Sequence, residues 1–413
     1  DESLIRQAAE LISANTKIII CWAMGLTQHK NAVSNIQELV NLLLLKGSIA
    51  KKGAGTCPVR GHSNVQGDRT MGIWEKPPEF LIKNLKKTFD FDPPTRHGYD
   101  VVQAIKAMHE NKAKVFIGMG GNFISATPDT VFTAEALKKC KLTVHVSTKP
   151  NRSHLIHGEK ALILPVLGRS EEDVQKSGHQ FVTVENSMGV VHSSKGNMPP
   201  SSKHIISEPE LICRLANVLF KNDTIDWLGF KDDYSLIRDK IEAVIPGFTS
   251  YNKKVENPAG FYLPNNARSG DFTKTATGKA NFTSHIVEPL ELSEKQLIMM
   301  TVRTHDQYNT TIYGLNDRYR GVYNERRVIF MNEEDMKDYG FINLEVVNIK
   351  SHFNGEERIA EKFKVVQYPI PRKCCATYFP ETNVLVPIGS VADKSNTPTS
   401  KFIKVTLEKH PNQ

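Results

Sequence analysis

The sequence predicts an α/β protein, with Rossmann-like parallel-sheet domains followed by a β-barrel at the C-terminal end. Three observations predict this fold class. Helical and short apolar strand patterns alternate over roughly the first half of the chain, glycines follow two of these strands, and short strands succeed one another beyond residue 296. A chain of 413 residues is long enough for about two to four domains with their own cores.

The first part of the chain reads as helix, strand, loop and helix. We expect a helix over residues 1–15 and a short buried strand over 17–22, "KIIICW". The polar segment 23–31, "AMGLTQHKN", is expected to be a loop at the C-terminal end of that strand, where open parallel sheets bind ligands. The next helix is expected to end at Gly47, because glycine favours the left-handed conformation of a C-terminal cap.

Segment 53–72 interrupts this regular pattern. "GAGTCPVRGHSNVQGDRTMG" holds five glycines and almost no apolar periodicity, so we expect neither a helix nor a strand within it. Loops of this length that lack structure of their own are usually functional. Arg60 lies between Pro58 and Gly61, which restrict the backbone, and a fixed guanidinium suits a planar anion. A surface arginine in a crossover between two domains is the alternative.

Beyond this loop the α/β alternation resumes. Asp100 is expected to cap one helix and Asp129 another. The strand "KVFIGMGGN" (114–122) runs into a glycine turn, as does "CWAMGLTQ" (21–28), but neither matches G-x-G-x-x-G, so the nicotinamide fingerprint is absent. Such turns also occur for structural reasons alone. Further strands are expected over 142–147, 161–165 and 181–186, and a helix over 209–220, with Ser207 and Glu210 as a capping box.

The last third of the chain predicts the barrel. Periodicity fades from 221 to 290, which we expect to be an irregular connecting region. Strands are expected over 296–304, 327–331, 344–351, 363–370, 383–388 and 401–408, with one short helix over 333–340. The resulting division is the end of an α/β domain with its loop (1–62), a second α/β domain (63–220), the connection (221–290) and the barrel (291–413).

Composition and charge argue against several classes of protein. With 39% hydrophobic and 24% charged residues the chain is typical of a soluble protein, and no apolar run approaches the roughly 20 residues of a membrane span. A net charge of +8 would suit nucleic acid, but the basic residues are dispersed and no aromatic-rich strand accompanies them, so we expect no nucleic-acid partner. None of the six cysteines forms a C-x2-C pair, and scattered free thiols indicate the cytoplasm.

Several motifs together resemble one family. "GAGTCPVRGHSNVQG" resembles the P-V-R-G-x-x-N-V-Q-G loop of molybdopterin oxidoreductases of the formate dehydrogenase alpha-subunit class. "MGLTQ" lies upstream of it, and "MGGN" and "TVRTHDQYNT" lie downstream. "ATYFPETNVLVPIGSVADKSNTPTSK" (376–401) resembles the YdeP-type branch of the family, which is associated with acid resistance. The resemblance covers nearly the whole chain and implies a barrel of the double-psi, molybdopterin dinucleotide-binding type.

The resemblance also implies a cofactor and a reaction. The cofactor would be bis-molybdopterin guanine dinucleotide with molybdenum or tungsten, and the reaction a two-electron oxidation or reduction of a small-molecule substrate, such as a small anion like formate. By the resemblance, the 4Fe–4S cluster, its cysteines and the metal-ligating residue are expected before the region covered here. The chain opens at Asp1, directly within a predicted helix, so we expect it to be part of a longer protein. The chain is therefore expected to be the C-terminal portion of an enzyme and to be inactive alone, with an unidentified electron-transfer partner.

Site residues follow from the resemblance by position. Arg60 falls on the family's active-site arginine, and His62 stands where a formate dehydrogenase is expected to have glutamine, so both are candidate catalytic residues. His62 as a hydrogen-bonded loop histidine is the alternative. The implied cofactor-binding residues are Met24, Gly25 and Gln28 along one dinucleotide, Gly120 and Asn122 along the other, Ser147, Thr148 and either Glu185 or Asn186 at a guanosine, and Arg303, Thr304, His305, Asn383 and Lys401 around the pterin. Pyrophosphates need amides and cations, and pterin edges need paired donors and acceptors.

Two other readings compete with this one. A non-enzymatic acid-stress or regulatory protein that retains the fold is the first, because a fold does not imply a function. A basic nucleic-acid binder is the second, and a steep salt dependence of DNA binding would support it.

Overall fold

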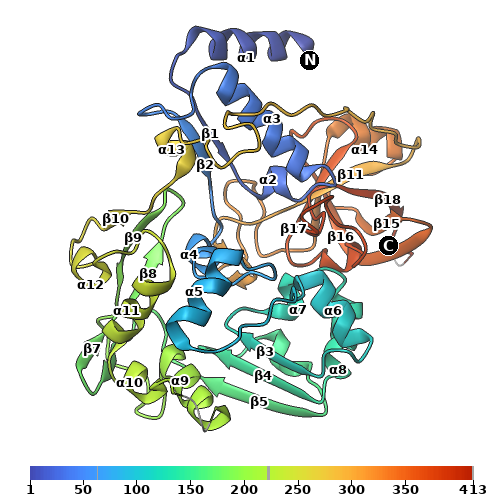
Figure 1. The fold of residues 1–413 in the computed structure, drawn as a ribbon. Coiled ribbons are helices and arrows are strands. Elements are labelled where there is room, and N and C mark those ends of the chain that lie inside the picture. The colour runs from blue at the N-terminus through green and yellow to red at the C-terminus, as the bar shows by residue number, and fades with distance from the viewer. Residues whose placement is uncertain (63, 221–223, 412–413) are drawn as a thin grey trace.

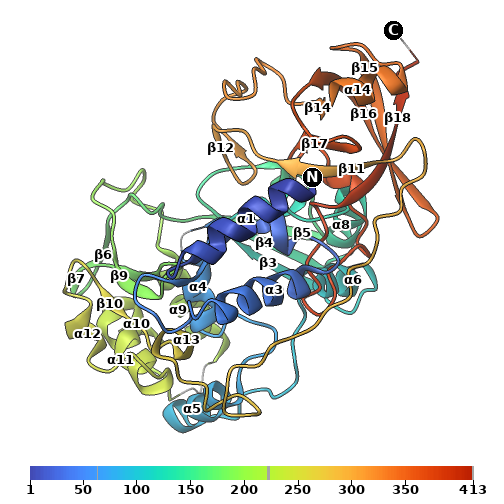
Figure 2. The same ribbon diagram turned by 90° about the horizontal axis from the view of Figure 1, so that it is seen from above.

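The computed structural model describes residues 1–62, 64–220 and 224–411. It confirms the predicted fold class, because mixed α/β units are followed by a closed β-barrel. In Figure 1 the orange and red barrel lies beside the blue N-terminal unit and the teal β3–β5 sheet. Figure 2 shows the yellow-green helices grouped at the end of the molecule away from the barrel. No helix within the described residues combines the length and the apolar character that crossing a bilayer requires.

The N-terminal unit confirms two helices and corrects two other expectations. It comprises α1 (Glu2–Ala14), β1 (Ile19–Trp22), α2 (Met24–Thr27), α3 (Ala32–Leu45) and β2 (Gly55–Pro58). Gly47 follows α3 with φ 56°, as expected of a C-terminal cap. The strand is not buried: Ile19 is 53% exposed, because among the described residues β1 pairs with β2 alone. Segment 23–31 is not a plain loop either, since Gln28 N donates to Met24 O and closes a helical turn.

The glycine-rich segment 53–72 contains more regular structure than expected. β2 pairs in parallel with β1, and α4 (Val65–Thr70) follows, so strand and helix occupy much of the described part of the segment, while Arg60 and His62 lie outside both elements. Asn64 begins α4 in the left-handed conformation, with φ 65°. A Cβ at Gly67 would lie 2.0 Å from Asn64 Oδ1, so a larger residue there would displace the asparagine side chain that folds over the first turn. This local packing explains how a glycine-rich stretch forms a helix.

A parallel sheet forms the centre of the second α/β unit. The elements are α5 (Glu79–Phe89), α6 (Val101–His109), β3 (Val115–Met119), α7 (Phe123–Ala126), α8 (Thr130–Lys138), β4 (Leu142–Ser147), the 3-10 helix η1 (Arg152–Leu155) and β5 (Lys160–Pro165). Strands β3, β4 and β5 are parallel neighbours in that order. Asp100 caps α6 as expected and forms a capping box with Gln103. Asp129 precedes α8 but makes no capping hydrogen bond, because its carboxylate accepts from Arg358 of the barrel instead.

Small antiparallel sheets and a helical group follow. They comprise β6 (Asp173–Gln175), β7 (Gly178–Gln180), β8 (Val182–Glu185), β9 (Val190–Ser194), α9 (Glu208–Leu219), α10 (Trp227–Asp232), α11 (Tyr234–Val244), α12 (Tyr251–Lys254), β10 (Phe261–Tyr262) and α13 (Asn266–Ser269). Ser207 caps α9 by accepting from Glu210 N, whereas the Glu210 carboxylate pairs with Arg214 and does not complete the expected capping box.

The expectation of irregular structure over 221–290 is wrong for much of that range. The side chain of Asp233 caps α11, and Ile241 and Val244 of this helix pack with Phe248 and Tyr251 into a buried cluster. The apolar spacing of α11 was the signal that would have predicted it. From about residue 271 to 296 the chain forms no helix or strand, as expected.

The C-terminal barrel closes with six strands. These are β11 (Leu297–Val302), β14 (Val328–Met331), β15 (Val346–Phe353), β16 (Glu356–Gln367), β17 (Cys374–Tyr378) and β18 (Ile403–Lys409), in the order β11-β17-β14-β16-β15-β18. Helix α14 (Glu333–Tyr339) ends at Gly340 as expected, and β12 (Gln307–Tyr308) pairs with β13 (Thr311–Ile312) beside the barrel. The interior is fully buried and apolar, with Leu297, Ile329 and Phe363 among its members.

One barrel strand was assigned to the wrong segment. The apolar run 383–388 contains the 3-10 helix η2 (Asn383–Leu385), and the missing strand is β17, whose side chains from Cys375 to Tyr378 are buried. The apolar run is buried against the barrel without pairing, which periodicity cannot distinguish from a strand. The predicted division into four domains stays a prediction, and its limits at 63 and 221 and its end at 413 lie outside the described residues.

Candidate functional site

Two segments of the N-terminal unit meet the mouth of the barrel. Lys401 N donates to Gln28 O over 3.2 Å, which attaches the end of α2 to the segment before β18. A Cβ at Gly61 would lie 3.9 Å from Met24 Cε, so the Arg60 loop lies against α2. Gln28 and Lys401, which were both predicted and lie 373 positions apart in the sequence, are thus brought together. We call Met24, Gln28, Arg60, His62, Arg303 and Lys401 the loop–barrel site.

Two cations that are shielded from solvent belong to this site, the half-buried Arg303 and the buried Lys401. The Arg303 guanidinium lies 3.8 Å from the ring centroid of Phe379, and burial lowers the pKa of Arg303 to about 10. Lys401 is 9% exposed; burial, followed by the charge of Arg303, lowers the pKa of Lys401 to about 8. Arg303 Nη2 donates to Asn309 Oδ1 over 3.1 Å and Lys401 Nζ donates to Thr301 O, both of them neutral acceptors. The two cations therefore repel each other without a carboxylate between them in the described part of the chain.

Unpaired polar atoms accompany these cations. Arg303 Nη1 and Gln28 Oε1 are buried and find no hydrogen-bond partner among the described residues. Leaving such an atom unpaired costs about 1–3 kcal/mol, so a bound group that offers an acceptor to one and a donor to the other is favoured. An anionic group with donors and acceptors along its edge, as in a pterin dinucleotide, fits this combination.

Arg60 and His62 are exposed on the loop that faces the barrel. Arg60 Nη2 donates to Gln66 Oε1 over 3.0 Å, and Arg60 N donates to Ser187 Oγ over 3.4 Å. His62 Nδ1 lies 3.2 Å from the hydroxyl of Tyr308, and the two rings form an edge-to-face pair. His62 is therefore a hydrogen-bonded loop histidine in this structure, and it connects the loop to β12.

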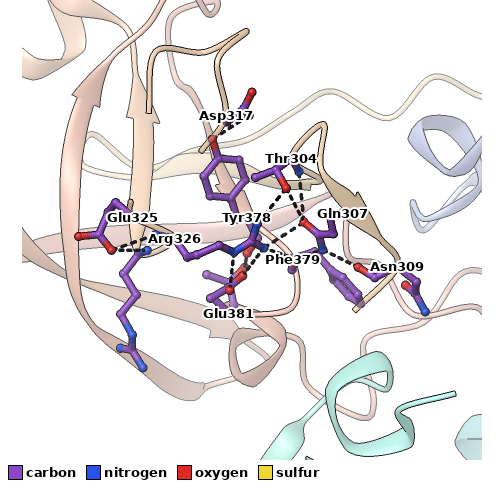
Figure 3. A network of polar contacts seen from close by, with 11 residues as sticks. Thr304, Gln307, Asn309, Asp317, Glu325, Arg326, Tyr378, Phe379 and Glu381 are labelled. Atoms are coloured by element: carbon purple, nitrogen blue, oxygen red, sulfur yellow. Dashed lines mark hydrogen bonds and ion pairs between the residues drawn. The ribbon is translucent and has the colours of Figure 1, made fainter. Parts of the chain in front are cut away.

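A buried network holds the barrel side of the site, as Figure 3 shows. Arg326 donates to both carboxylate oxygens of Glu381, at 2.8 and 3.0 Å, and to Thr304 Oγ1 at 3.1 Å. Gln307 Oε1 accepts from Arg326 Nη2 and from Thr304 N, so the segment that follows β11 is fixed from inside. The hydroxyl of Tyr378 donates to Asp317.

Thr304 was predicted from the sequence, whereas Arg326, Gln307 and Glu381 were not. These three residues lie in separate segments of the sequence, and no single local motif contains them, so sequence patterns did not indicate the network. His305, the neighbour of Thr304, is exposed, and its ring lies 4.5 Å from that of Tyr319. The exposed imidazole therefore does not belong to this buried network.

A second group of predicted residues lies at the C-terminal edge of the β3–β5 sheet. Gly120 has φ 69° and follows β3, and Asn122 Oδ1 accepts from Ser153 Oγ over 2.9 Å. Ser147 ends β4 and donates to Lys149 O over 2.9 Å, and Thr148 next to it is exposed. This edge is where open parallel sheets bind ligands.

Asn383 and His145 lie close to the same sheet edge. Asn383 is 1% exposed and donates to Ser125 O of α7, so it joins the barrel to this unit. His145 of β4 was not predicted. Burial, followed by the charge of His154, lowers its pKa, and its buried Nε2 has no partner among the described residues.

Glu185 and Asn186 make their hydrogen bonds with residues outside the two groups described above. Asn186 Oδ1 accepts from Met188 N and Val190 N within its own β-turn, and Glu185 accepts from Thr70 Oγ1 over 2.5 Å. Burial raises the pKa of Glu185, with the Thr70 hydroxyl opposing the shift. Glu185 lines a cavity of about 270 Å³ between β8 and α11, together with Arg238 and Tyr251 among other residues. The structure thus attaches Glu185 to α4, whereas the Asn186 side chain stays within its own turn.

The described residues offer little for direct metal ligation. Within them, no group of three or more His, Cys, Asp or Glu side chains is arranged to hold a metal ion. A metal at the loop–barrel site would therefore depend on ligands from a bound group or from outside the described residues.

Comparison with known proteins identifies the barrel and extends the likeness to the whole chain. Residues 297–404 match the family described as "Molydopterin dinucleotide binding domain". An uncharacterized oxidoreductase of Mycobacterium tuberculosis strain H37Rv is 50% identical over 410 residues, which cover 98% of this chain and 53% of that protein. YdeP of Escherichia coli K12 is 42% identical over 413 residues, which cover 98% of this chain and 54% of YdeP. The chain spans about half the length of these curated relatives.

Two more distant proteins are also similar to this chain over nearly its whole length. The F420-dependent formate dehydrogenase subunit alpha of Methanocaldococcus jannaschii is 25% identical over 434 residues, which cover 99% of this chain and 61% of that protein. The solved structure of acetylene hydratase from Pelobacter acetylenicus has the same fold, with a TM-score of 0.66 at 14% identity over 99% of this chain and 63% of that one. The barrel is thus a molybdopterin dinucleotide-binding domain, and over nearly its whole length the chain is similar to an uncharacterized oxidoreductase, to YdeP and to a formate dehydrogenase alpha subunit.

Proposed function

We propose that the chain is the C-terminal portion of an oxidoreductase that uses bis-molybdopterin guanine dinucleotide with molybdenum or tungsten. The observation that carries this proposal is the pair of cations at the loop–barrel site, the half-buried Arg303 and the buried Lys401, which lie beside unpaired polar atoms and lack an acidic partner in the described part of the chain. A polyanionic cofactor relieves both the repulsion and the unmet hydrogen bonds.

The residues of the loop–barrel site have distinct roles in this proposal. Arg303 and Lys401 bind the anionic cofactor, Gln28 accepts a hydrogen bond from its edge, and Thr304 is kept in position by Arg326. When bound, the cofactor supplies a metal that accepts or donates two electrons. The protein orients this cofactor, and the exposed Arg60 and His62 lie on the loop opposite the barrel, where a substrate is accessible to both.

The second dinucleotide belongs to the β3–β5 edge in this proposal. Gly120 and Asn122 contribute amides, Ser147 and Thr148 face a guanosine, and the buried Asn383 holds the barrel against this edge. Gly25 and His305 complete the set of cofactor-binding residues. Asn186 is the weakest member, because its side-chain oxygen already accepts two backbone hydrogen bonds.

The substrate is proposed to be a small anion, for which formate is the model. Arg60 supplies the charge that such a substrate requires. A hydrogen bond to a charged group contributes about 1.5–3 kcal/mol, so Arg60→Met in the complete enzyme should lower kcat/KM by roughly 10- to 150-fold, with little change in cofactor content. Arg69→Met, a change at another exposed arginine of the same region, should leave turnover unaltered. If Arg60→Met instead emptied the cofactor site, Arg60 would anchor the cofactor.

Other parts of the proposal concern the complete protein. A 4Fe–4S cluster and the metal-ligating residue would lie outside these 413 residues, and electrons would pass through that cluster to an electron-transfer partner. The dispersed free thiols favour a cytoplasmic location. Acid resistance is proposed as the setting because of the likeness to YdeP.

Cofactor analysis tests the proposal. The complete polypeptide should be purified without oxygen, analysed for molybdenum and tungsten, and hydrolysed in acid to release GMP from any guanine dinucleotide. We expect one metal atom and two molecules of GMP per polypeptide. A folded protein with neither metal nor GMP would favour the non-enzymatic acid-stress or regulatory reading.

A further inference from the structure

Two cysteines face each other across the strands that lead into the loop–barrel site. Cys21 of β1 and Cys57 of β2 are register partners in a parallel pair. Register partners in a parallel pair project from the same face of the sheet, and neighbouring strands lie about 4.7–4.9 Å apart. A disulfide spans Cα atoms about 4.4–6.8 Å apart, so the strand spacing permits a bond between this pair. Both carry free thiols.

The two thiols differ in their surroundings. Cys21 is exposed and Cys57 is half-buried. Burial first, and then the hydrogen bond and the charge of the Cys21 sulfur, raise the pKa of Cys57. The exposed thiol is thus the one that a reagent in solution reaches first, and the half-buried thiol is its immediate neighbour.

The other cysteines provide an internal comparison. Cys140, Cys213 and Cys375 are buried, and burial raises the pKa of each thiol. Cys374 is a sequence neighbour of Cys375 in β17, where successive side chains project to opposite faces. Among the described residues, only Cys21 and Cys57 combine access to solvent with a thiol partner on the same face.

We propose that Cys21 and Cys57 form an oxidation site for hydroperoxides, which closes as a disulfide between β1 and β2. The Cys21 thiolate attacks a peroxide oxygen, so that an S–O bond forms, the O–O bond breaks and hydroxide or alkoxide leaves. The Cys57 sulfur then attacks the Cys21 sulfur, the S–S bond forms, and the S–O bond breaks with release of water. Two thiols lose two electrons and two protons, and the peroxide is reduced to water and an alcohol, or to two waters.

The position of this bond gives it a consequence for the neighbouring site. Val59 N donates to Trp22 O over 2.8 Å directly after the cysteine pair, and α2 and the Arg60 loop begin there. A bond between Cys21 and Cys57 would tie together the two strands that carry Met24 and Arg60. The proposal does not depend on the proposed cofactor, because it concerns only the thiols of this chain.

Peroxide treatment of the reduced, folded chain tests the proposal, with dimedone as a trap for sulfenic acid. The wild type should lose two hydrogen atoms in mass, yield a peptide that links Cys21 to Cys57, and bind little dimedone. Cys57→Ser should bind dimedone at Cys21 and form no link, and Cys374→Ser should behave as the wild type. Linking should accelerate as the pH rises, because a larger share of the Cys57 thiol is then ionised.

Three results would overturn the proposal. The first is dimedone bound at Cys21 of the wild type without a link to Cys57. The second is a link that forms first between other cysteines, and the third is a Cys21–Cys57 link that appears only when the chain is unfolded. Circular dichroism on the same samples distinguishes folded from unfolded chain.

Discussion

Lys401 and Arg303 carry two positive charges into a place from which most water is excluded. A buried ammonium without a carboxylate is unfavourable, and the structure shows this as the lowered pKa of Lys401, about 8 instead of 10.5. Natural proteins retain such groups where a ligand or a reaction requires them more often than where packing does. The pH dependence of stability is therefore a direct test of this pair.

The free energy of unfolding should depend on Lys401 between pH 8 and 10.5. In this window the unfolded chain binds more protons at Lys401 than the folded chain, so stability rises with pH and is lost again as the pH falls toward 8. At about 1.36 kcal/mol per pKa unit, the contribution of Lys401 amounts to about 3 kcal/mol. Urea unfolding should show that the stability difference between Lys401→Met and the wild type changes by this amount across the window. Lys404→Met should follow the wild type at every pH, and a Lys401→Met curve parallel to the wild type would contradict the assignment.

At the level of elements, α4 shows how one residue type sets the shape of the Arg60 loop. Asn64 Oδ1 accepts from Glu185 N over 3.0 Å and occupies the space that a Cβ at Gly67 would need. The loop is therefore attached to β8 through the Asn64 side chain, and a Cβ at position 67 would displace that side chain.

Gly67→Ala should break this attachment. The displaced Asn64 side chain would leave the buried Glu185 amide unpaired, at a cost of about 1–3 kcal/mol in the free energy of unfolding. Amide hydrogen exchange at Glu185 should accelerate. Gly25→Ala is the matched change, because a Cβ at Gly25 meets nothing within 4 Å among the described residues. Equal stability of the two variants would show that Asn64 is not the anchor.

Sequence patterns predicted elements well where local rules decide the structure. The helices capped by Asp100 and ended by Gly340 and the five barrel strands with clear apolar runs were predicted, because caps and periodicity are local. β17 was missed, because its burial comes from neighbours that are distant in sequence. Asp129 was assigned to a cap although it binds Arg358, a partner that lies 229 residues away.

The candidate site also divides into residues that local motifs indicate and residues whose role depends on distant partners. Its members were assigned from motif resemblance, and the structure brings Gln28, Arg303 and Lys401 together. The Arg326 network and His145 were missed, because their importance arises from burial and from partners that no local motif reveals.

In the whole molecule, Asp129 is one of the residues that join the barrel to the β3–β5 unit. Asp129 Oδ2 accepts from Arg358 Nη2 over 2.8 Å and from Ile388 N over 3.1 Å, and Asp129 N donates to Asn383 O. These contacts hold the two sides of the proposed cofactor site at a fixed separation.

Asp129→Ala should loosen the barrel from this unit. Hydrogen bonds to a charged group contribute about 1.5–3 kcal/mol each, so the exchange of the Ile388 amide should accelerate by at least tenfold while exchange inside the barrel stays slow. Glu135→Ala, on the same helix but exposed, should leave Ile388 unchanged. Uniform acceleration throughout the barrel would show that Asp129 stabilises the barrel itself and does not act as a link.

The central claim is that Arg303 and Lys401 bind the dinucleotide cofactor, and the GMP content of lysine variants tests it most directly. The complete polypeptide should be produced as wild type, Lys401→Met and Lys404→Met, and the GMP released by acid should be measured per folded chain. We predict that Lys401→Met loses most of its GMP, whereas Lys404→Met, whose Nζ donates to Glu291 O, retains the wild-type amount. Full GMP content in a folded Lys401→Met protein would contradict the claim.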